Sequence, residues 1–409
     1  MIRRIAPYLM VALCLAGCGA TSAECGPSTC AEGCCSSSGE CVTGDVTSAC
    51  GAGGNLCNVC VGAQVCTARV CTLPELRIDA GTEDAGVVDP NAISAAPEVW
   101  TWVAFPDAVC GNGQPTGIGV NPSTRSTDVF VYLQGGGACW EGLTCFTLGT
   151  ADNIETGYGA TDFASDFTKS APGFNRLLNA NPLRDASYVF VPYCTGDVHA
   201  GDAVRTYSTQ QGTRMVHFKG GKNMEAYLRR LKATFPAARR IFLSGSSAGA
   251  FGAQLNYQRV VDAFPGAEVH VLADSGQMIN PRGTRLDDWV AAWNIAIPAS
   301  CTTCAANFPA YVTWLTSTFP TRRFALLAYS QDAVLRQFFD YQPAEYQVQT
   351  EALLAQQYDG QANARYFYLA GDSHTMLGNL SLASPSGEKL SDFLGAFVRG
   401  DASWANVHP

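Results

Sequence analysis

Residues 240–251 read RIFLSGSSAGAF, and this stretch decides the fold. Residues 240–244 form a short apolar run, which predicts a buried strand. Residues 245–249, GSSAG, match the pattern G-x-S-x-G, and a helical stretch follows directly. A serine between a buried strand and a helix is typical of a nucleophile elbow. The stretch therefore predicts an α/β sheet with Ser247 at its carboxyl edge.

Five further apolar runs predict the rest of the sheet. They are residues 128–133, 187–192, 268–273, 324–329 and 365–370. Stretches such as 221–235 and 249–264 carry the amphipathic spacing of helices. Continuous apolar strands followed by helices are typical of a mostly parallel sheet that is covered on both faces. We therefore expect an α/β domain over residues 98–409.

A glycine-rich loop follows the first of these strands. Residues 134–140 read QGGGACW and resemble the oxyanion loop of lipases and esterases. Glycine lets a backbone N–H turn towards the carbonyl oxygen of a bound ester. We expect one N–H of this loop and the N–H of Ala248 to stabilise the oxyanion, with about 2.7–4 kcal/mol from each donor.

A histidine and an acid are expected after Ser247, in the order serine, acid, histidine. His374 lies in the loop that follows run 365–370. Asp332 follows run 324–329 and is the first candidate acid, although it could instead cap the helix that begins there. Asp274, one strand earlier, is the second candidate acid.

Six segments together resemble the pectin acetylesterase/Notum family. They are GGGACW at 135–140, PYCTGD at 192–197, GSSAG at 245–249, ADSG at 273–276, SQD at 330–332 and SH at 373–374. The resemblance covers roughly residues 99–398. It implies an α/β-hydrolase-like fold and serine carboxylesterase activity that needs no metal and no organic cofactor.

The resemblance also implies a role for each matching residue. Ser247 is the nucleophile, Asp332 the acid and His374 the base. Gly136, Gly137 and Ala248 match the oxyanion region, and Asp274 and Asp197 become structural residues near the site.

An aromatic-rich segment over about residues 281–323 is expected to form a helical cap at the carboxyl edge of the sheet. Trp289 and Trp293 in this cap, together with Trp140 after the glycine-rich loop, are candidates for lining the substrate pocket. The alternative is that each of these rings packs within a core.

The 18 cysteines indicate an oxidising compartment. Ten of them lie in residues 25–71, which contain no aromatic residue, so disulfides must hold this module together. A zinc site at Cys57 and Cys60 is the alternative, but the module has no histidine. Residues 34–41 resemble a hevein-type chitin-binding module without its sugar-stacking rings, so we expect a stalk or a knob that binds an unknown partner.

Six cysteines belong to the α/β domain. Cys139 with Cys145 and Cys301 with Cys304 are local pairs. A third disulfide, Cys110 with Cys194, is a hypothesis, because six cysteines allow fifteen connectivities.

The amino terminus predicts export. Residues 1–17 have the charged and apolar parts of a signal peptide, and LAGC at 15–18 resembles a bacterial lipobox. We expect lipid on Cys18, an anchored stretch 18–24, and residence at the outer membrane or cell surface. The alternative is an ordinary cleaved signal and a secreted protein. Residues 72–97 are expected to be an acidic flexible linker.

Composition narrows the function. Lys and Arg number 26 against 35 Asp and Glu, a net charge of −9, which argues against nucleic acid as a partner. The leading hypothesis is an ester hydrolase acting on acylated carbohydrate or another acylated substrate, with membrane contact through the lipid alone. The alternatives are a polyester depolymerase, a serine amidase, and a surface binding protein on an inactive hydrolase scaffold.

Overall fold

The computed structural model describes residues 25–60, 64–72, 89–210 and 212–409. The chain divides into two units, of which the first ends at residue 86 and the second begins at residue 87. The predicted signal peptide, Cys18 and most of the predicted linker lie outside the described residues. Within the described ranges, no helix is both long and apolar enough to cross a membrane.

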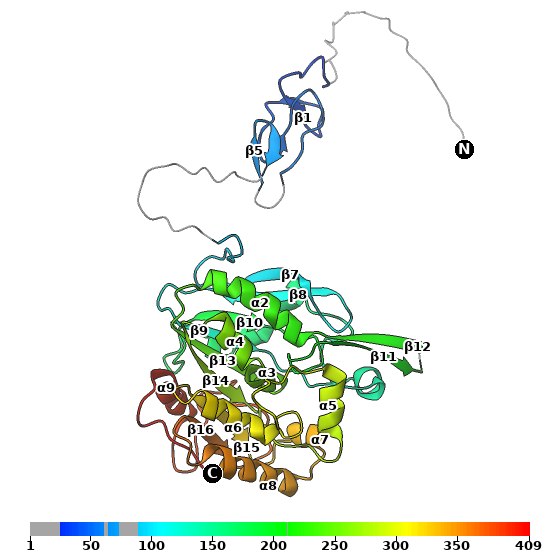
Figure 1. Ribbon diagram of the computed structural model, residues 1–409. Helices are drawn as coiled ribbons and strands as arrows, with labels where there is room; N and C mark the ends of the chain where they lie inside the picture. Colours follow the sequence, from blue (N-terminus) through cyan, green and yellow to red (C-terminus); the bar gives the residue numbers. More distant parts are fainter. Residues whose placement is uncertain (1–24, 61–63, 73–88, 211) are drawn as a thin grey trace, which may run out of the picture. The chain divides into compact units, whose positions relative to one another are not determined.

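The second unit is built on an eight-stranded sheet with the order β16-β15-β14-β13-β9-β10-β8-β7 (Figure 1). The strands are β7 Thr101–Val109, β8 Pro115–Asn121, β9 Val129–Leu133, β10 Ser187–Val191, β13 Arg240–Ser246, β14 Glu268–Asp274, β15 Phe324–Tyr329 and β16 Ala364–Leu369. The six strands from β16 to β10 run parallel, and β8 and β7 add an antiparallel hairpin at one edge. These six strands lie within two residues of the six predicted runs, so the mostly parallel α/β fold is confirmed.

Both faces of this sheet are buried. In β9, Val129, Val131 and Leu133 belong to the core on one face, whereas Phe130 and Tyr132 belong to the core on the other. Successive side chains of a strand point to opposite faces, so a run that is apolar at every position fills both cores.

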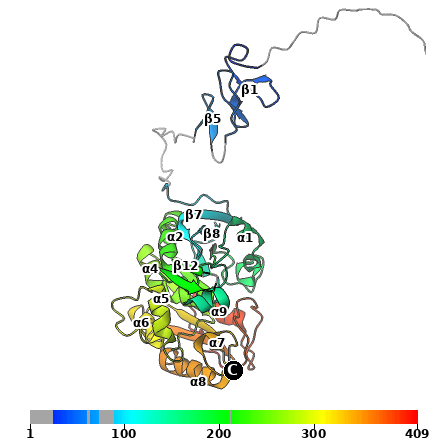
Figure 2. The same cartoon turned by 90° about the vertical axis from the view of Figure 1, so that its right-hand side faces the viewer.

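Helices cover the two faces unequally (Figures 1 and 2). The first core takes side chains from α2 Gly220–Thr234, α3 Ala248–Leu255, α4 Tyr257–Ala263, α5 Arg285–Trp293, α6 Phe308–Thr318, α7 Leu335–Phe339 and α8 Pro343–Leu353. The second takes them from α1 Ala160–Ser165 and α9 Leu390–Arg399. Short 3-10 or π turns complete the unit at Leu143–Thr147, Phe167–Ser170, Pro172–Phe174 and Leu354–Tyr358.

The predicted helix 249–264 is wrong as a single element. The structure divides it into α3 and α4 at Asn256, whose backbone leaves the helical region at φ −93° and ψ 1°. The Asn256 side chain donates to the carbonyl oxygens of His199 and Gly252, at 2.8 and 2.9 Å. A side chain that bonds the backbone locally competes with helix propagation.

The sequence also missed two β hairpins. One is β7–β8, where Gly117 and Gly119 weaken the strand pattern, yet a Cβ at either position would collide with neighbours at 2.1 and 2.2 Å. The other is the ribbon of β11 Ala203–Thr209 and β12 Gly212–Phe218, whose residues are mostly polar. Edge and ribbon strands have one solvated face and therefore lack the continuous apolar signal.

The first unit has a disulfide-based core. Its short strands are β1 Cys34–Cys35, β2 Cys41–Val42, β3 Asp45–Val46, β4 Ala49–Cys50, β5 Val65–Thr67 and β6 Val70–Thr72. Five disulfides join Cys25–Cys35, Cys30–Cys41, Cys34–Cys57, Cys50–Cys66 and Cys60–Cys71. Cys57 and Cys60 are thus both oxidised, and neither is free to bind zinc as a thiolate.

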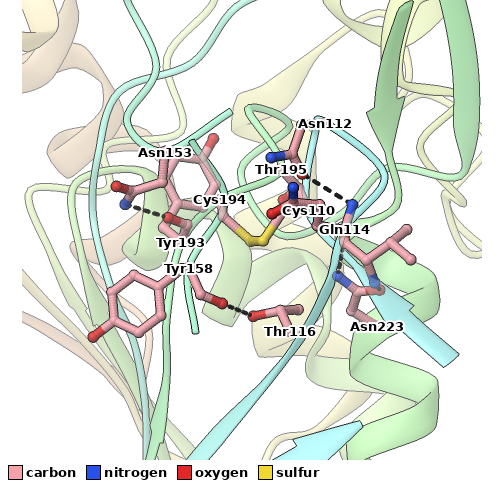
Figure 3. The surroundings of a disulfide bond; sticks show 12 residues. Cys110, Asn112, Gln114, Thr116, Asn153, Tyr158, Tyr193, Cys194, Thr195 and Asn223 are labelled. Atoms are coloured by element: carbon pink, nitrogen blue, oxygen red, sulfur yellow. Dashed lines mark hydrogen bonds between the residues drawn. A yellow bond between two sulfur atoms is a disulfide. The ribbon is translucent and has the colours of Figure 1, made fainter. Parts of the chain in front are cut away.

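Three more disulfides lie in the second unit: Cys139–Cys145, Cys301–Cys304 and Cys110–Cys194. The last joins the end of β7 to the loop after β10, and Figure 3 shows it among the hydrogen bonds that hold this region. Residues 89–97, assigned to the linker from composition, contact the same unit. Ile93 is buried there, and its N–H donates to Thr234 Oγ1 of α2 at 2.8 Å.

Candidate active site

Ser247 stands at the turn between β13 and α3. Its backbone adopts φ 56° and ψ −125°, a region that costs free energy for a residue with a Cβ. Two glycines leave room for this turn. A Cβ on Gly245 would lie 2.3 Å from Gly249, and a Cβ on Gly249 would lie 1.9 Å from Leu133 O. The glycines of the G-x-S-x-G pattern are therefore required by close backbone packing, and the turn has the form of a nucleophile elbow.

The imidazole of His374 is held by Asp332. His374 Nδ1 lies 2.8 Å from Oδ2 and 2.9 Å from Oδ1 of Asp332, whose side chain is fully buried. An ionised carboxylate only accepts hydrogen bonds, so Nδ1 carries the proton and Nε2 is left as the basic nitrogen. Asp332 Oδ1 also accepts the N–H groups of Val334 and Leu335. The carboxylate thus caps a turn, as the alternative interpretation held, and binds the histidine as well.

Asp274, the second candidate acid, makes no hydrogen bond to the imidazole. Its Oδ1 accepts the N–H of Met376 at 2.7 Å, and its Oδ2 accepts the N–H of Leu377 at 3.0 Å and the hydroxyl of Ser246 at 2.7 Å. Its backbone carbonyl accepts the N–H of Ser247 at 2.8 Å. One buried residue therefore ties the elbow to the loop that carries His374.

Burial raises the pKa of Asp274 to about 6. The two backbone N–H groups, the Ser246 hydroxyl and the nearby charge of His374 oppose this rise. A carboxyl with this pKa is mostly ionised at neutral pH, where it accepts all three hydrogen bonds.

The ring of His374 and the hydroxyl of Ser247 are not bonded in the structure. Within the described residues, the hydrogen bonds of the ring run from Nδ1 to Asp332, and none joins Nε2 to Ser247 Oγ. In the absence of substrate, catalytic hydrogen bonds are often long, and they tighten when the substrate binds. The links through Asp274 keep the two residues at the same end of the sheet.

The glycine-rich loop runs beside the elbow. A Cβ on Gly136 would lie 2.6 Å from the Tyr193 ring, and one on Gly137 would lie 2.0 Å from Thr150 O. Gly137 has φ 72°, which favours glycine. The N–H of Ala138 donates to Thr150 O at 3.0 Å, whereas no such hydrogen bond is made by the N–H groups of Gly136 and Gly137 in the described residues, so both can serve as donors to a ligand.

Ala248 supplies the second candidate N–H donor for an oxyanion. It is the first residue of α3, so its N–H has no partner within the helix. Ala248, Gly137 and Ser247 line one pocket, which places two of the three predicted oxyanion residues next to the nucleophile candidate.

His199 bonds the backbone of the glycine-rich loop, a role that was not predicted from the sequence. Its Nε2 lies 2.8 Å from Gln134 O, and burial lowers its pKa to about 4, so the ring is neutral. Asp197, two residues earlier, is also buried and accepts hydrogen bonds from Thr195, Gly201 and Gly220. The available signal was the PYCTGDVHAG stretch itself, which concentrates polar residues directly after a fully apolar strand.

The pocket at Ser247 is apolar and narrow. Its other walls are Val198, Phe251, Leu255, Trp289, Trp293, Phe308, Leu335, Phe338 and Phe339. The space open to the centre of a water-sized molecule is about 40 Å³. Trp289 and Trp293 are stacked with centroids 5.8 Å apart, and Trp293 Nε1 donates to Cys139 O at 2.7 Å. Trp289 and Trp293 therefore both line the pocket at Ser247.

The third tryptophan candidate lies outside this pocket. Trp140 packs edge-on against Trp289 at 5.7 Å and lines a separate open hollow. That hollow also contains Tyr207, Arg205, Arg282, Arg285, Glu141 and Asp288. Phe308 also lines the pocket at Ser247, whereas two other aromatics of the segment 281–323 pack within the core. Phe319 contacts Tyr257, and Trp314 contacts Phe319.

Comparison with known proteins identifies a family whose sequence pattern this chain matches. Residues 99–311 match the family model described as Pectinacetylesterase. This range includes Ser247 and the glycine-rich loop and ends before Asp332 and His374.

Curated relatives match over a similar region. Human palmitoleoyl-protein carboxylesterase NOTUM is 26% identical over 218 residues, which are 47% of this chain and 42% of that protein. The mouse protein of the same name is 26% identical over 198 residues, 46% of this chain and 37% of that protein. Xenopus laevis notum1' is 29% identical over 183 residues, 42% of this chain and 35% of that protein. The chain thus spans less than half the length of these relatives.

Proposed function

This chain belongs to the pectinacetylesterase family, and on that premise we propose that it is a serine carboxylesterase that removes short acyl groups from a carbohydrate. The observation that carries the proposal is the contact of buried Asp332 with His374 Nδ1, in a loop that Asp274 ties to the strained turn at Ser247. The family and its relatives support a carboxylesterase in general. The serine mechanism and the class of substrate are our inference.

The residues of the site account for each step of ester hydrolysis. His374 Nε2 takes the proton of Ser247 Oγ as the oxygen attacks the ester carbonyl, and Asp332 stabilises the imidazolium that forms. The N–H groups of Ala248 and of Gly136 or Gly137 bind the oxyanion. His374 then protonates the leaving alcohol. Water attacks the acyl-enzyme with His374 as base, which releases the acid and restores Ser247.

The size of the pocket favours a short acyl group. About 40 Å³ open to the centre of water is room for a few waters at most, since one water needs about 10–15 Å³ of such space. An acetyl group fits this space, whereas a long fatty acyl chain would have to displace Phe338 or other ring walls.

The hollow beside the pocket favours a carbohydrate as the alcohol part. Trp140 and Tyr207 offer ring faces, and Arg205, Arg282 and Arg285 offer guanidinium donors for hydroxyl or carboxylate oxygens. The hollow is separated from the acyl pocket by the Trp140–Trp289 contact.

We also propose that the protein acts outside the cytoplasm. Eight disulfides in the described residues require an oxidising compartment. Lipid attachment at Cys18 remains part of this proposal, with an ordinary cleaved signal as the alternative.

The test is hydrolysis of p-nitrophenyl acetate, butyrate and palmitate by the purified protein. We expect kcat/KM to be highest for acetate and lowest for palmitate. The variant Phe338→Ala widens the pocket and should shift the preference towards butyrate. A preference for palmitate would contradict the short-acyl proposal. A folded protein inactive on all three esters and on acetylated polysaccharide would favour the binding-protein alternative.

A further inference from the structure

A second cavity lies on the opposite face of the sheet from the acyl pocket. Its walls include Phe130 of β9, Leu272 of β14, Leu394 of α9, Phe174, Leu183 and Leu380. The space open to the centre of a water-sized molecule is about 180 Å³, against about 40 Å³ in the acyl pocket. This larger cavity takes no part in the proposed hydrolysis.

Two of the polar side chains in its walls are already hydrogen-bonded within the protein. The Ser246 hydroxyl donates to Asp274 Oδ2. The Asn181 amide donates to the carbonyl oxygens of Gly173 and Asn175, and its Oδ1 accepts the N–H of Leu183. None of the described residues that line the cavity carries a charge. The hydroxyls of Tyr132, Thr168 and Thr375 also belong to the wall, but the wall is otherwise mostly apolar. Because a buried water needs two to four polar partners, an apolar molecule fills most of this space better than water does.

We propose that this cavity binds one uncharged apolar molecule, a hydrocarbon or the hydrocarbon part of a small molecule. An apolar cavity of about 150 Å³ in another protein stays dry and binds benzene or xenon. The cavity here is slightly larger and most of its wall is also apolar, so a single aromatic ring with one or two methyl groups fits it. The absence of charge among the described wall residues excludes fatty acid carboxylates and phosphate esters as preferred ligands.

The roof of the cavity provides access. Residues 166–183 contain two 3-10 helices, Phe167–Ser170 and Pro172–Phe174, and no strand. Segments without a continuous hydrogen-bond ladder open at lower free energy than the sheet beneath them. A ligand can therefore enter without breaking the strands.

The ligand would touch the loop that carries His374. Thr375, Leu377 and Leu380 of this loop are part of the cavity wall. The same loop is tied to Asp274 through the N–H groups of Met376 and Leu377. An apolar molecule packed against Leu377 and Leu380 therefore stabilises the loop in the conformation seen here, and its binding should slow local unfolding of the loop.

The first test is thermal unfolding of the full chain with and without toluene. We expect toluene to raise the Tm of the wild type by about 2 °C at ten times its Kd. Ala171 lines the cavity, so Ala171→Leu should fill it and abolish the rise. Ala180 is exposed in the same segment and lies outside the cavity, so Ala180→Leu is the matched control and should keep the rise. No rise in the wild type, or an equal rise in Ala171→Leu, overturns the proposal.

A second test needs no variant. Xenon density under pressure, in crystals of the wild type, should occupy the space between β9, α9 and residues 171–183. Xenon in the acyl pocket alone, or in neither cavity, overturns the proposal. With toluene bound, the amides of Met376 and Leu377 should exchange with deuterium at least threefold more slowly, and an unchanged rate overturns the effect on the loop. Neither measurement uses an ester, so failure of the proposed esterase function would not affect the result.

Discussion

Ser246 and Ser247 are consecutive residues at the end of one strand, and the structure gives them opposite surroundings. Ser247 faces the narrow apolar pocket, whose walls include Gly137 of the glycine-rich loop and the tryptophans Trp289 and Trp293. Ser246 faces Asp274 and the second cavity, and its hydroxyl is used in a buried hydrogen bond. The same side chain is thus a candidate nucleophile on one face of the sheet and part of a support on the other. The role of each serine is therefore determined by the face of the sheet on which its side chain lies and not by the residue type.

The two buried carboxylates of the site divide in the same way. Asp332 accepts a hydrogen bond from the imidazole of His374. Asp274 accepts hydrogen bonds from the backbone N–H groups of Met376 and Leu377, two and three residues after His374. Asp332 therefore fixes the orientation and tautomer of a ring, and Asp274 fixes the position of the loop that carries it. Substitutions of Ser247 or Asp332 should therefore remove a catalytic group. Substitutions of Ser246 or Asp274 should only displace the catalytic groups and lower the rate less.

The largest effect is expected for Ser247→Ala. Removing the nucleophile of a serine hydrolase costs about 10⁶ in kcat, because the covalent step is lost. The measurement is the initial rate on p-nitrophenyl acetate, with circular dichroism to show that the fold is intact. Retention of more than one hundredth of the activity would exclude Ser247 as the nucleophile.

Asp332→Asn comes second. The amide can present an N–H to the ring and so favours the wrong tautomer of His374, which should lower kcat by about 10⁴ with little change in KM. Asp372→Asn is the matched control, because Asp372 is exposed and lies in the same loop as His374. If the control lost as much activity as the variant, the role assigned to Asp332 would be wrong.

Asp274→Asn is expected to have a smaller effect on catalysis. The amide keeps one acceptor oxygen and so cannot hold all three donors, and a displaced His374 loop should lower kcat about 10- to 100-fold. A drop as large as that of Asp332→Asn would make Asp274 the acid of the triad instead.

The same variant tests stability against pH. Burial raises the pKa of Asp274 in the folded protein to about 6, above the ordinary value of 3.8 that it has in the unfolded chain. Between these values the folded chain keeps a proton that the unfolded chain has lost, so this group stabilises the fold at low pH and the contribution is lost as the pH rises through 6. The two-unit difference corresponds to about 3 kcal/mol. The difference in unfolding free energy between wild type and Asp274→Asn should therefore shrink from pH 4 to pH 7, and a constant difference would contradict the raised pKa.

The smallest effect is expected for Ser246→Ala. It removes one hydrogen bond to Asp274, worth about 1 kcal/mol, and leaves both backbone donors in place. Activity should fall less than tenfold, and loss of the hydroxyl should raise the pKa of Asp274 further. The measurements are kcat and the pH dependence of Tm. A loss of activity comparable to that of Ser247→Ala would show that Ser246 is not merely a supporting residue, and would contradict the different roles assigned to the two serines.

Much of the fold was predictable because its central strands are buried on both faces. Such strands are apolar at every position, and this signal located β9, β10 and β13 to β16 to within two residues. Strands with one solvated face, such as β7 and those of the β11–β12 ribbon, gave no comparable run. The break at Asn256 was missed because it depends on a carbonyl oxygen of His199, far away in the sequence.

The candidate site was predictable as a set of residues and not as an arrangement. The G-x-S-x-G pattern and the order of strands placed Ser247, Asp332 and His374 at the ends of neighbouring elements. The sequence ranked Asp332 above Asp274, from its place after run 324–329 and from the family resemblance. That Asp332 contacts the ring while Asp274 contacts the loop is a matter of contacts between distant residues, which sequence order does not give.

By itself the sequence determined the strand–turn–helix at Ser247, the glycines that this turn requires, and a module of ten cysteines that needs disulfides in place of a core. These features follow from short-range sterics and composition, which neighbouring residues fix locally. The tertiary structure alone decided that Ser246 supports and Ser247 faces the pocket, that Asp274 ties the loop of His374 to the elbow, and that a second cavity lies behind the site. Each of these depends on contacts between residues that are distant in the chain, and those exist only once the sheet has brought its strand ends together.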